Sequence, residues 1–243
     1  MLNNMKIIVT GAASGIGKEI VKHCLREGAK VIACDINDVL LNDLQQIIGS
    51  DFLYTYKIDV SKYDEVVRFF TYVKERHSDV NGLVNNAGIY FGKSILDYKT
   101  EEIDKVLNIN IKGYIYFTQL FGRLIIQKSH HGNIVNISSV SGIEGSSDAI
   151  YGLSKAAILG LTKSCAMNYS PYIRVNAVAP TLVNTSMIDN IPEWRKEEYL
   201  NNQLIKESIL PEDVAYTVTF LLSEKSKHYT GATFDLNNGC YLR

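Results

Sequence analysis

The sequence predicts an α/β protein built on one doubly wound parallel sheet of about seven strands, with helices on both faces. Short apolar runs alternate with longer amphipathic stretches along the whole chain, and strict alternation of strand and helix is the pattern of such a sheet. Several runs are continuous Val, Ile and Leu segments, which is typical of strands buried on both faces. The 243 residues contain no linker or repeat, so residues 1–243 are expected to form a single domain.

Seven apolar runs are expected to form the strands. They are Lys6–Val9, Lys30–Cys34, Phe52–Ile58, Gly82–Asn85, Gly132–Ile137, Arg174–Val178 and Thr233–Leu236. Ligands of doubly wound sheets bind beyond the carboxyl ends of the strands, so functional residues are expected directly after these runs.

Six amphipathic stretches are expected to form the helices. They are Ile16–Arg26, Val39–Ile48, Tyr63–Arg76, Glu101–Gln127, Ala149–Tyr169 and Pro211–Leu222. The first has apolar residues at Ile16, Ile20 and Val21, which share one helical face. The last begins with a proline and has Glu212 and Asp213 in its first turn, a favourable helix start.

The bulk composition excludes several classes of function. The formal net charge is -1, without a basic stripe, so no nucleic-acid partner is expected. No uncharged apolar run reaches the roughly 18 residues of a membrane span. Four scattered cysteines without a CxxC pair indicate reduced thiols and a cytoplasmic location. The five histidines show no ligand spacing, so no metal site is expected.

A glycine-rich turn joins the first strand to the first helix, with the sequence Thr10-Gly11-Ala12-Ala13-Ser14-Gly15-Ile16-Gly17. The three glycines allow a sharp turn, close approach of backbone to a ligand, and close packing of the helix on the sheet. The free N–H groups of the helix, Ser14 and Ile16 included, then face a pyrophosphate. The spacing Gly-x3-Gly-x-Gly resembles the signature of the classical short-chain dehydrogenase/reductase family. Length and element order match as well, so the resemblance covers essentially the whole chain and implies a Rossmann-type fold.

The acidic residue after the second strand bears on the choice of cofactor. Asp35 can accept hydrogen bonds from both ribose hydroxyls of an adenosine and would repel the extra phosphate of NADP. NADP-preferring relatives carry a basic residue where this chain has Ser14 or Ile36. NAD is therefore expected rather than NADP. The alternative is that Asp35 only caps the next turn.

Two further strand ends resemble cofactor-binding segments of the family. Asp59 and Val60 follow the third strand and correspond to its adenine pocket, although Asp59 or Ser61 is also suited to cap the next helix. Asn85-Asn86-Ala87-Gly88 closes the fourth strand. In the family, this segment lets the cofactor pass closely and ties neighbouring strands together, which assigns Asn86, Ala87 and Gly88 to the cofactor site.

A tyrosine and a lysine are placed to form a chemical centre. Tyr151 and Lys155 are four residues apart in an expected helix and share a face. Tyrosine has a pKa near 10, and a neighbouring ammonium lowers it, which makes the phenol a usable acid and base. Such a pair is common by chance, but Ser138 and Ser139 end the fifth strand upstream. By motif position Ser139 faces the substrate oxygen, with Ser138 as the alternative because the interval to Tyr151 is one residue shorter than in many relatives.

The resemblance implies roles for the remaining site residues. Asn110 matches the helix asparagine that links a water to the lysine, with Asn108 as a nearby alternative, and asparagine needs a reason to stand inside a helix. Val183 and Thr185 stand where the nicotinamide carboxamide is held, although Thr181 replaces a glycine of the family pattern.

Residues 182–205 are expected to form a substrate lid. Its only tryptophan, Trp194, is expected either to line the substrate pocket or to anchor the lid. The other departure from the family pattern is Asn237-Asn238-Gly239, in place of an Asp-Gly-Gly sequence.

The resemblance implies an oxidoreductase that transfers a hydride between NAD(H) and a small secondary alcohol or ketone without a metal. The cofactor carries the hydride, while serine, tyrosine, lysine and asparagine handle the substrate oxygen and its proton. A homo-oligomer, tetramer or dimer, is implied as well. The alternatives are a non-catalytic NAD(H)-binding regulator on the same fold, which would not need all four polar residues, and a sugar-nucleotide epimerase, which has a different glycine spacing.

Overall fold

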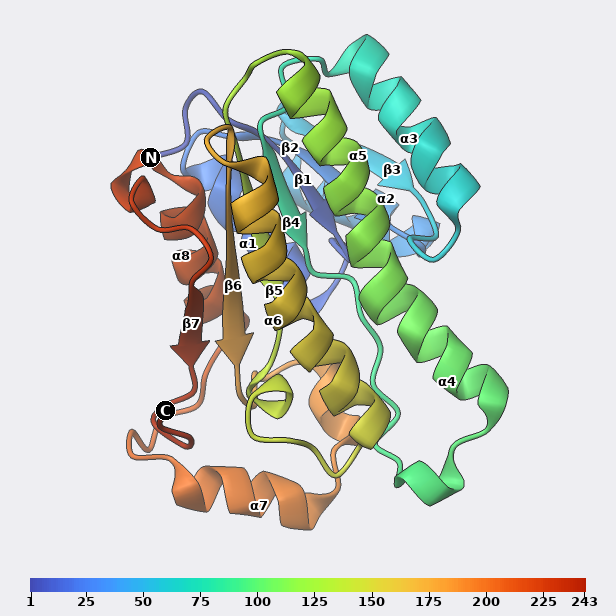
Figure 1. Cartoon of the computed structure of the whole chain (residues 1–243), viewed down its shortest axis with the longest axis vertical. Coiled ribbons are helices and arrows are strands. Elements are labelled where there is room, and N and C mark those ends of the chain that lie inside the picture. The colour runs from blue at the N-terminus through green and yellow to red at the C-terminus, as the bar shows by residue number, and fades with distance from the viewer.

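The computed structural model describes residues 1–243 and contains one seven-stranded parallel sheet of order β3-β2-β1-β4-β5-β6-β7 (Figure 1). The strands are β1 (Lys6–Thr10), β2 (Lys30–Asp35), β3 (Leu53–Lys57), β4 (Gly82–Asn85), β5 (Gly132–Ile137), β6 (Ile173–Pro180) and β7 (Thr233–Leu236). All seven expected strands are confirmed, three with the expected ends and the others with ends that differ by at most two residues. Strand β1 pairs with β2 on one side and β4 on the other. The order reverses there, which opens a crevice at the carboxyl ends of β1 and β4.

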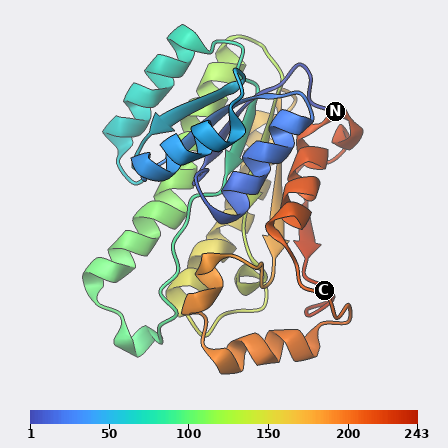
Figure 2. The same ribbon diagram turned by 180° about the vertical axis from the view of Figure 1, so that it is seen from behind.

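Helices cover both faces of this sheet. They are α1 (Gly15–Arg26), α2 (Asp38–Ile48), α3 (Tyr63–Arg76), α4 (Thr100–Leu107), α5 (Gly113–Gln127), α6 (Ala149–Tyr169), α7 (Glu193–Asn202) and α8 (Pro211–Leu222). Helices α3, α5 and α6 lie over one face (Figure 1), and α1, α2 and α8 lie over the other (Figure 2). The single-domain Rossmann-type architecture expected from the sequence is therefore confirmed.

Each central strand is buried on both faces, which explains its continuous apolar sequence. Along β1, Ile7 and Val9 belong to the core under α1 and α8, whereas Ile8 belongs to the core under α3 and α5. Strand β2 repeats the pattern, with Val31 on the first face and Ile32 on the second. Successive side chains of a strand point to opposite faces, so a strand between two helical layers needs apolar residues at every position.

The expected helix Glu101–Gln127 is interrupted in the structure. Helices α4 and α5 are joined by a wider π-helical turn at Asn108–Lys112, in which the Gly113 N–H donates to the Asn108 carbonyl. Such π-turns often mark functional sites. Periodicity alone did not indicate the interruption, because a π-turn of five residues is too short to have a distinct period of its own.

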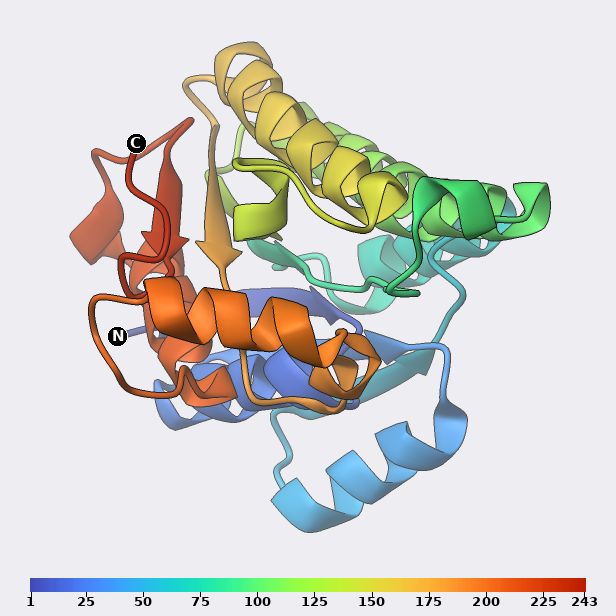
Figure 3. The ribbon, with the colours of Figure 1, turned by 90° about the horizontal axis from the view of Figure 1, so that it is seen from below.

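The expected lid contains a helix that periodicity did not predict. Helix α7 lies across the carboxyl ends of the strands (Figure 3), and Tyr199 is its only buried residue. The chain after α7 is held by Asn238, whose carbonyl accepts from the N–H groups of Leu204 and Ile205. Asn238 adopts φ +52°, a left-handed conformation that asparagine tolerates. None of the helices has both the length and the apolar character that crossing a membrane requires.

Candidate active site

A cavity of about 350 Å³ lies beyond the carboxyl ends of the central strands. It brings together most of the residues singled out in the sequence. These lining residues are Gly11, Ser14, Gly15, Ile16, Asp35, Asp59, Val60, Asn86, Ala87, Gly88, Ser139, Tyr151, Lys155, Val183 and Thr185. Two others, Gly17 and Asn110, do not line it but contact residues that do, Gly11 and Ile89 respectively. The His, Cys, Asp and Glu side chains form no group of three or more suited to hold a metal ion.

The glycine-rich turn has the shape that close approach of a ligand requires. Gly11 and Gly15 have φ of +62° and +49°, conformations that favour glycine. A Cβ on Gly17 would collide with the Gly11 carbonyl oxygen, so only glycine lets α1 approach the turn. Ser14 is the N-cap of α1 but its hydroxyl makes no capping hydrogen bond. The first N–H groups of α1 therefore remain available to an anion such as a pyrophosphate.

Asn86 fastens this turn to the end of β4. Its Nδ2 donates to the carbonyl oxygens of Thr10 and Gly11, both at 3.0 Å. In return, the Thr10 hydroxyl accepts from the backbone N–H groups of Asn86 and Ala87 at 3.0 and 3.2 Å. The shape of the turn is thus fixed by the neighbouring strand end.

Asp35 makes the turn contact that the sequence left as an alternative to cofactor binding, whereas neither Asp59 nor Ser61 is the N-cap of the next helix. That N-cap is Lys62. Asp35 accepts from the N–H groups of Ala13 and Asn37, both at 3.0 Å, one on each carboxylate oxygen. Asp59 accepts from the backbone N–H of Ser61 at 3.0 Å and from its hydroxyl at 2.6 Å. Both carboxylates also line the cavity, and a carboxylate has about four acceptor sites. Each can therefore fix its own loop and still bind a ligand hydroxyl or amine.

The two candidate serines have different partners. The Ser138 hydroxyl donates to the Lys155 carbonyl at 2.7 Å and is used in holding α6. The Ser139 hydroxyl accepts from the Ser141 N–H at 3.2 Å and lies within hydrogen-bonding reach of Tyr151. This geometry favours Ser139 over Ser138 as the residue beside the reacting oxygen.

Burial controls the ionisation of Tyr151 and Lys155. Burial raises the pKa of Tyr151 above its usual range, and the hydrogen bond with Ser139 opposes the rise. Burial lowers the pKa of Lys155 to about 8. The pKa of Tyr151 is thus raised rather than lowered as expected, and Lys155 is not among the groups that shift it. Lys155 Nζ donates to the Ile137 carbonyl at 2.9 Å and lies 5.7 Å from the centre of the Tyr151 ring.

Asn110 lies fully buried inside the π-turn. Its Oδ1 accepts from the Ile89 N–H and its Nδ2 donates to the Ile89 carbonyl, both at 2.9 Å. The same Nδ2 donates to the Ser154 hydroxyl at 3.1 Å. The side chain thus connects the chain after β4 with α6, where Tyr151 and Lys155 stand. This accounts for an asparagine within a helix, and it distinguishes Asn110 from Asn108.

Asp148 is a functional residue that the sequence analysis did not identify. Its Oδ1 accepts from the Tyr151 N–H at 3.0 Å and its Oδ2 from the Gly92 N–H at 3.0 Å. The Tyr98 hydroxyl donates to the same carboxylate at 2.8 Å. Asp148 is therefore the N-cap of the helix that carries Tyr151. An aspartate directly before an apolar helix is the signal that indicates this role.

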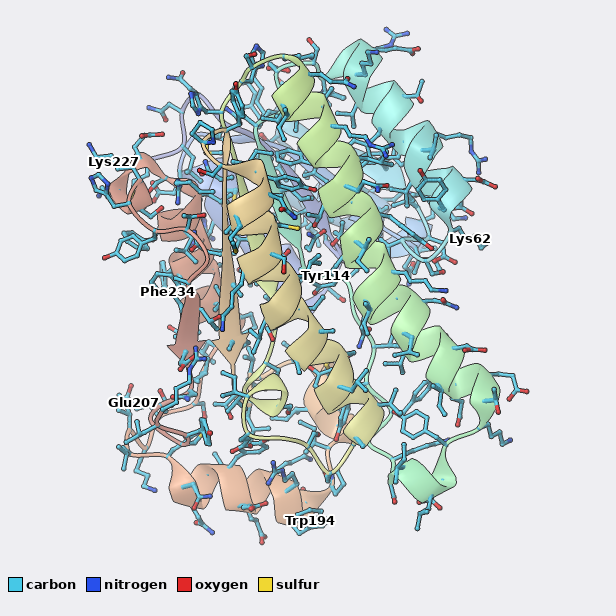
Figure 4. All side chains as sticks on the ribbon, in the orientation of Figure 1. Lys62, Tyr114, Trp194, Glu207, Lys227 and Phe234 are labelled. Carbon is cyan, nitrogen blue, oxygen red and sulfur yellow. The ribbon has the colours of Figure 1, made fainter.

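The lid residues differ from expectation. Trp194 is 58% exposed and does not line the cavity, so neither role expected of it is correct; it lies on the outer side of α7 (Figure 4). Arg195 and Tyr199 of the same helix line the cavity instead. Thr181 also lines it without positive φ, so this position does not need the glycine of the family pattern.

Comparison with known proteins covers nearly the whole chain. The model of the family described as enoyl-(acyl carrier protein) reductase matches residues 11–241. The 3-oxoacyl-(acyl-carrier-protein) reductase of Thermotoga maritima is 36% identical over 241 residues, which cover 97% of each chain. Dehydrogenase/reductase SDR family member 6 of Rattus norvegicus is 34% identical and covers 99% of each chain. The (3R)-3-hydroxyacyl-CoA dehydrogenase of Mus musculus is 32% identical over 99% of this chain and 98% of its own.

Two solved structures share the fold over the full length of this chain. The 3-ketoacyl-(acyl-carrier-protein) reductase of Brucella melitensis complexed with NADH superposes with a TM-score of 0.93 at 24% identity and full coverage of both chains. A short-chain dehydrogenase/reductase of the same organism, described as a glucose/ribitol dehydrogenase, has a TM-score of 0.92 at 26% identity. The superposition covers 98% of that chain and 100% of this one.

Replacement of Asp148 by alanine is expected to destabilise the fold by about 1–3 kcal/mol, because it removes a helix cap and leaves the partly buried donors of Gly92 and Tyr98 without their acceptor. Asp148→Asn keeps a cap and should cost less than half as much. Urea denaturation followed by circular dichroism measures both. Asp189→Ala removes an exposed carboxylate as a matched control. Equal midpoints for Asp148→Ala and Asp189→Ala would show that the Asp148 contacts contribute nothing.

Proposed function

This chain belongs to the short-chain dehydrogenase/reductase family of nicotinamide-dependent oxidoreductases, and we propose that it transfers a hydride between NAD(H) and a secondary alcohol or ketone. The observation that carries the proposal is the placement of Ser139, Tyr151 and Lys155 on one cavity with the glycine-rich turn. The glycine turn is suited to a dinucleotide, and the three side chains are suited to a carbonyl oxygen.

The nucleotide half of the cavity fits the cofactor. The open N–H groups of α1 suit the pyrophosphate, and the Asp35 carboxylate suits the adenosine ribose. Val183 and Thr185 line the opposite wall, and the Thr185 methyl group would lie 3.3 Å from a Cβ on Gly15. Any side chain at Gly15 would therefore fill the space between the turn and the lid. When bound, the nicotinamide ring supplies or accepts the hydride.

The chain's own residues handle the substrate oxygen and its proton. Ser139 orients the oxygen by a hydrogen bond, and the Tyr151 hydroxyl donates the proton during reduction. Lys155 is held by the Ile137 carbonyl and has donors left for the nicotinamide ribose. Asn110 helps to position Tyr151 and Lys155, because its Nδ2 connects the Ile89 carbonyl with the Ser154 hydroxyl on the same helix.

Burial of Tyr151 sets the protonation state of the proposed proton donor near neutral pH. A raised pKa keeps the hydroxyl protonated, and the protonated phenol is the form that donates to a carbonyl oxygen. Alcohol oxidation needs the phenolate, which burial disfavours. The named relatives include a 3-oxoacyl reductase and a 3-hydroxyacyl dehydrogenase, both of which support carbonyl–alcohol interconversion.

The alternative is a non-catalytic NAD(H)-binding regulator on the same fold. Such a protein would need the glycine turn and Asp35 but not a serine beside Tyr151. The glycine turn with Asp35 and the pair of Ser139 and Tyr151 line one cavity, which favours the enzyme over the regulator. A homo-oligomer, tetramer or dimer, stays a prediction from the family; the exposed apolar side chains of Leu153 and Met167 on α6 are available to such a contact.

The substitution Tyr151→Phe is expected to lower kcat for NADH-dependent ketone reduction by at least about 100-fold, because it removes the proton donor. NADH binding, followed by nucleotide fluorescence, should change little. Tyr216→Phe removes an exposed hydroxyl as a matched control. Reduction at an unchanged rate by the Tyr151 variant would exclude this mechanism, and NADH binding without turnover of any ketone by the wild type would favour the regulator.

The pH dependence should differ between the two directions. With saturating cofactor, kcat/KM for ketone reduction should stay level between pH 5.5 and 7, because Tyr151 remains protonated there and the pH stays below the Lys155 pKa of about 8. For alcohol oxidation it should rise with pH over the same range by up to about tenfold per unit, because the small phenolate fraction grows. Initial rates in constant-ionic-strength buffers measure both profiles. A reduction rate that falls between pH 5.5 and 7 would mean that the Tyr151 pKa is not raised.

Asp35 is expected to set a preference for NADH over NADPH of at least about tenfold in kcat/KM, since its charge repels the 2′-phosphate. Asp35→Asn is nearly isosteric and should reduce that ratio at least tenfold, whereas Asp51→Asn on the surface should leave it unchanged. Initial rates with each cofactor give the ratio. Comparable turnover of the wild type with NADPH would contradict the assignment.

A further inference from the structure

The end of the cavity beyond Tyr151 contains an unusual number of hydroxyl groups and one guanidinium group. The polar side chains of this region are Tyr90, Ser141, Ser146, Ser147, Arg195 and Tyr199. None of them is used in the proposed hydride transfer. They come from three separate segments: the loop after β4, the loop before α6, and α7. Polar groups in a largely apolar pocket are what fix the orientation and identity of a small ligand.

Arg195 is held in place by three partners. Its Nη1 donates to Glu198 at 2.6 Å, and its Nη2 donates to Glu144 at 3.0 Å and to the Tyr199 hydroxyl at 2.9 Å. The guanidinium carbon also lies 4.3 Å from the centre of the Tyr199 ring. An arginine has five N–H donors, so Nε and one hydrogen of Nη1 have no protein partner, and the residue itself lines the cavity.

The charge around Arg195 disfavours an anionic ligand. Glu144 and Glu198 together carry one more charge than the guanidinium neutralises, and the Arg195 and Glu144 side chains are only 15% and 19% exposed. A substrate carboxylate or phosphate would have to approach both carboxylates, of which Glu144 is the less screened, because the Glu198 side chain is 45% exposed. Neutral acceptors such as hydroxyl groups meet no such repulsion. The two remaining N–H donors therefore suit a neutral oxygen.

Tyrosine and serine hydroxyls occur in pairs on two sides of Tyr151. Tyr90 packs edge-on against the Tyr151 ring at 4.9 Å between centres, with Ser147 within hydrogen-bonding reach. Tyr199 lies within similar reach of Ser141. A hydroxyl both donates and accepts, so these pairs match a ligand whose own groups do the same.

The lid also supplies apolar side chains to this region. Ile188 and Ile191 line the cavity and pack on Val140 and Leu182, together with the Tyr199 ring. This cluster offers an apolar contact to the carbon skeleton of a ligand.

We propose that the substrate of this cavity is a compact, uncharged polyhydroxylated ketone or alcohol, a small sugar or polyol, whose hydroxyls bind Arg195, Tyr199 and the neighbouring serines. The proposal rests on the hydride-transfer function proposed above and names its substrate class. An acyl thioester would place hydrocarbon against the unpaired donors of Arg195, which is costly when those groups lose water. A 3-oxo acid would bring its anion towards Glu144 and Glu198.

The test compares four classes of substrate with NADH or NAD at fixed cofactor concentration. These are neutral ketoses and polyols of three to six carbons, unsubstituted alkanones and alkanols of the same lengths, acetoacetate, and the acetoacetyl thioester of N-acetylcysteamine. We expect kcat/KM for the best hydroxylated substrate to exceed that for its unsubstituted counterpart by roughly 100-fold, since a site that hydrogen-bonds hydroxyls rejects analogues without them. It should also exceed the values for acetoacetate and the thioester.

Variants connect this preference to the named residues. Arg195→Met and Tyr199→Phe should each reduce the hydroxylated-to-unsubstituted ratio at least tenfold, chiefly through a higher KM for the hydroxylated substrate. Arg123→Met and Tyr216→Phe change exposed residues far from the cavity wall and should leave the ratio unchanged. Melting temperatures within a few degrees of wild type show that the variants fold.

The outcomes separate the two proposals. Tyr151-dependent turnover that is best with the thioester or with acetoacetate overturns the substrate class and leaves hydride transfer standing. The same holds for a hydroxyl preference that survives both Arg195→Met and Tyr199→Phe. No Tyr151-dependent turnover with any of the four classes overturns the proposed function, and the substrate class with it.

Discussion

The connection from β4 to the loop that follows it is the constraint on which the whole site depends. Asn86 holds the glycine-rich turn of β1 through the Thr10 and Gly11 carbonyls. Three residues later, Ile89 pairs with Asn110 in the π-turn, and Gly92 donates to Asp148 at the start of α6. One extended segment thus sets the position of the phosphate turn, the helix interruption and the helix that carries Tyr151. Its polar backbone groups are satisfied by distant side chains, which makes it rigid without regular secondary structure.

The electrostatics of the centre follow from where this segment places α6. Burial raises the pKa of Tyr151 and lowers that of Lys155, so both shifts favour the neutral side chain. Loss of hydration therefore opposes a phenolate–ammonium pair. The Tyr151 hydroxyl therefore stays protonated and uncharged, which suits donation of its proton to a carbonyl oxygen. The hydrogen bond from Ser139 is the one nearby contribution that acts on Tyr151 in the opposite sense.

The sequence was sufficient to predict the sheet and the residues that line the cavity near the glycine-rich turn, but not the lining residues that helix α7 supplies. Strands such as β1 were predictable because burial on both faces leaves a continuous apolar run. The π-turn at Asn110 and helix α7 were not, since neither has a distinct period, and α7 buries only Tyr199. Arg195 acquires its place from Glu144, which is distant in sequence. Pairings of this kind are set by tertiary contacts that no local pattern encodes.

From the sequence alone, an aspartate at the end of a strand is explained either by a contact with the following turn or by ligand binding; in the structure the two roles are compatible. Asp35 accepts from the Asn37 N–H in the turn after β2 and also lines the cavity; Asp59 does the same after β3. In a parallel α/β sheet, each strand ends where the next turn or helix needs an acceptor, and that edge is also where ligands bind. One carboxylate, with several acceptor sites, meets both needs. A hydrogen bond from such an aspartate to the following turn is therefore no argument against a role of the same carboxylate in ligand binding.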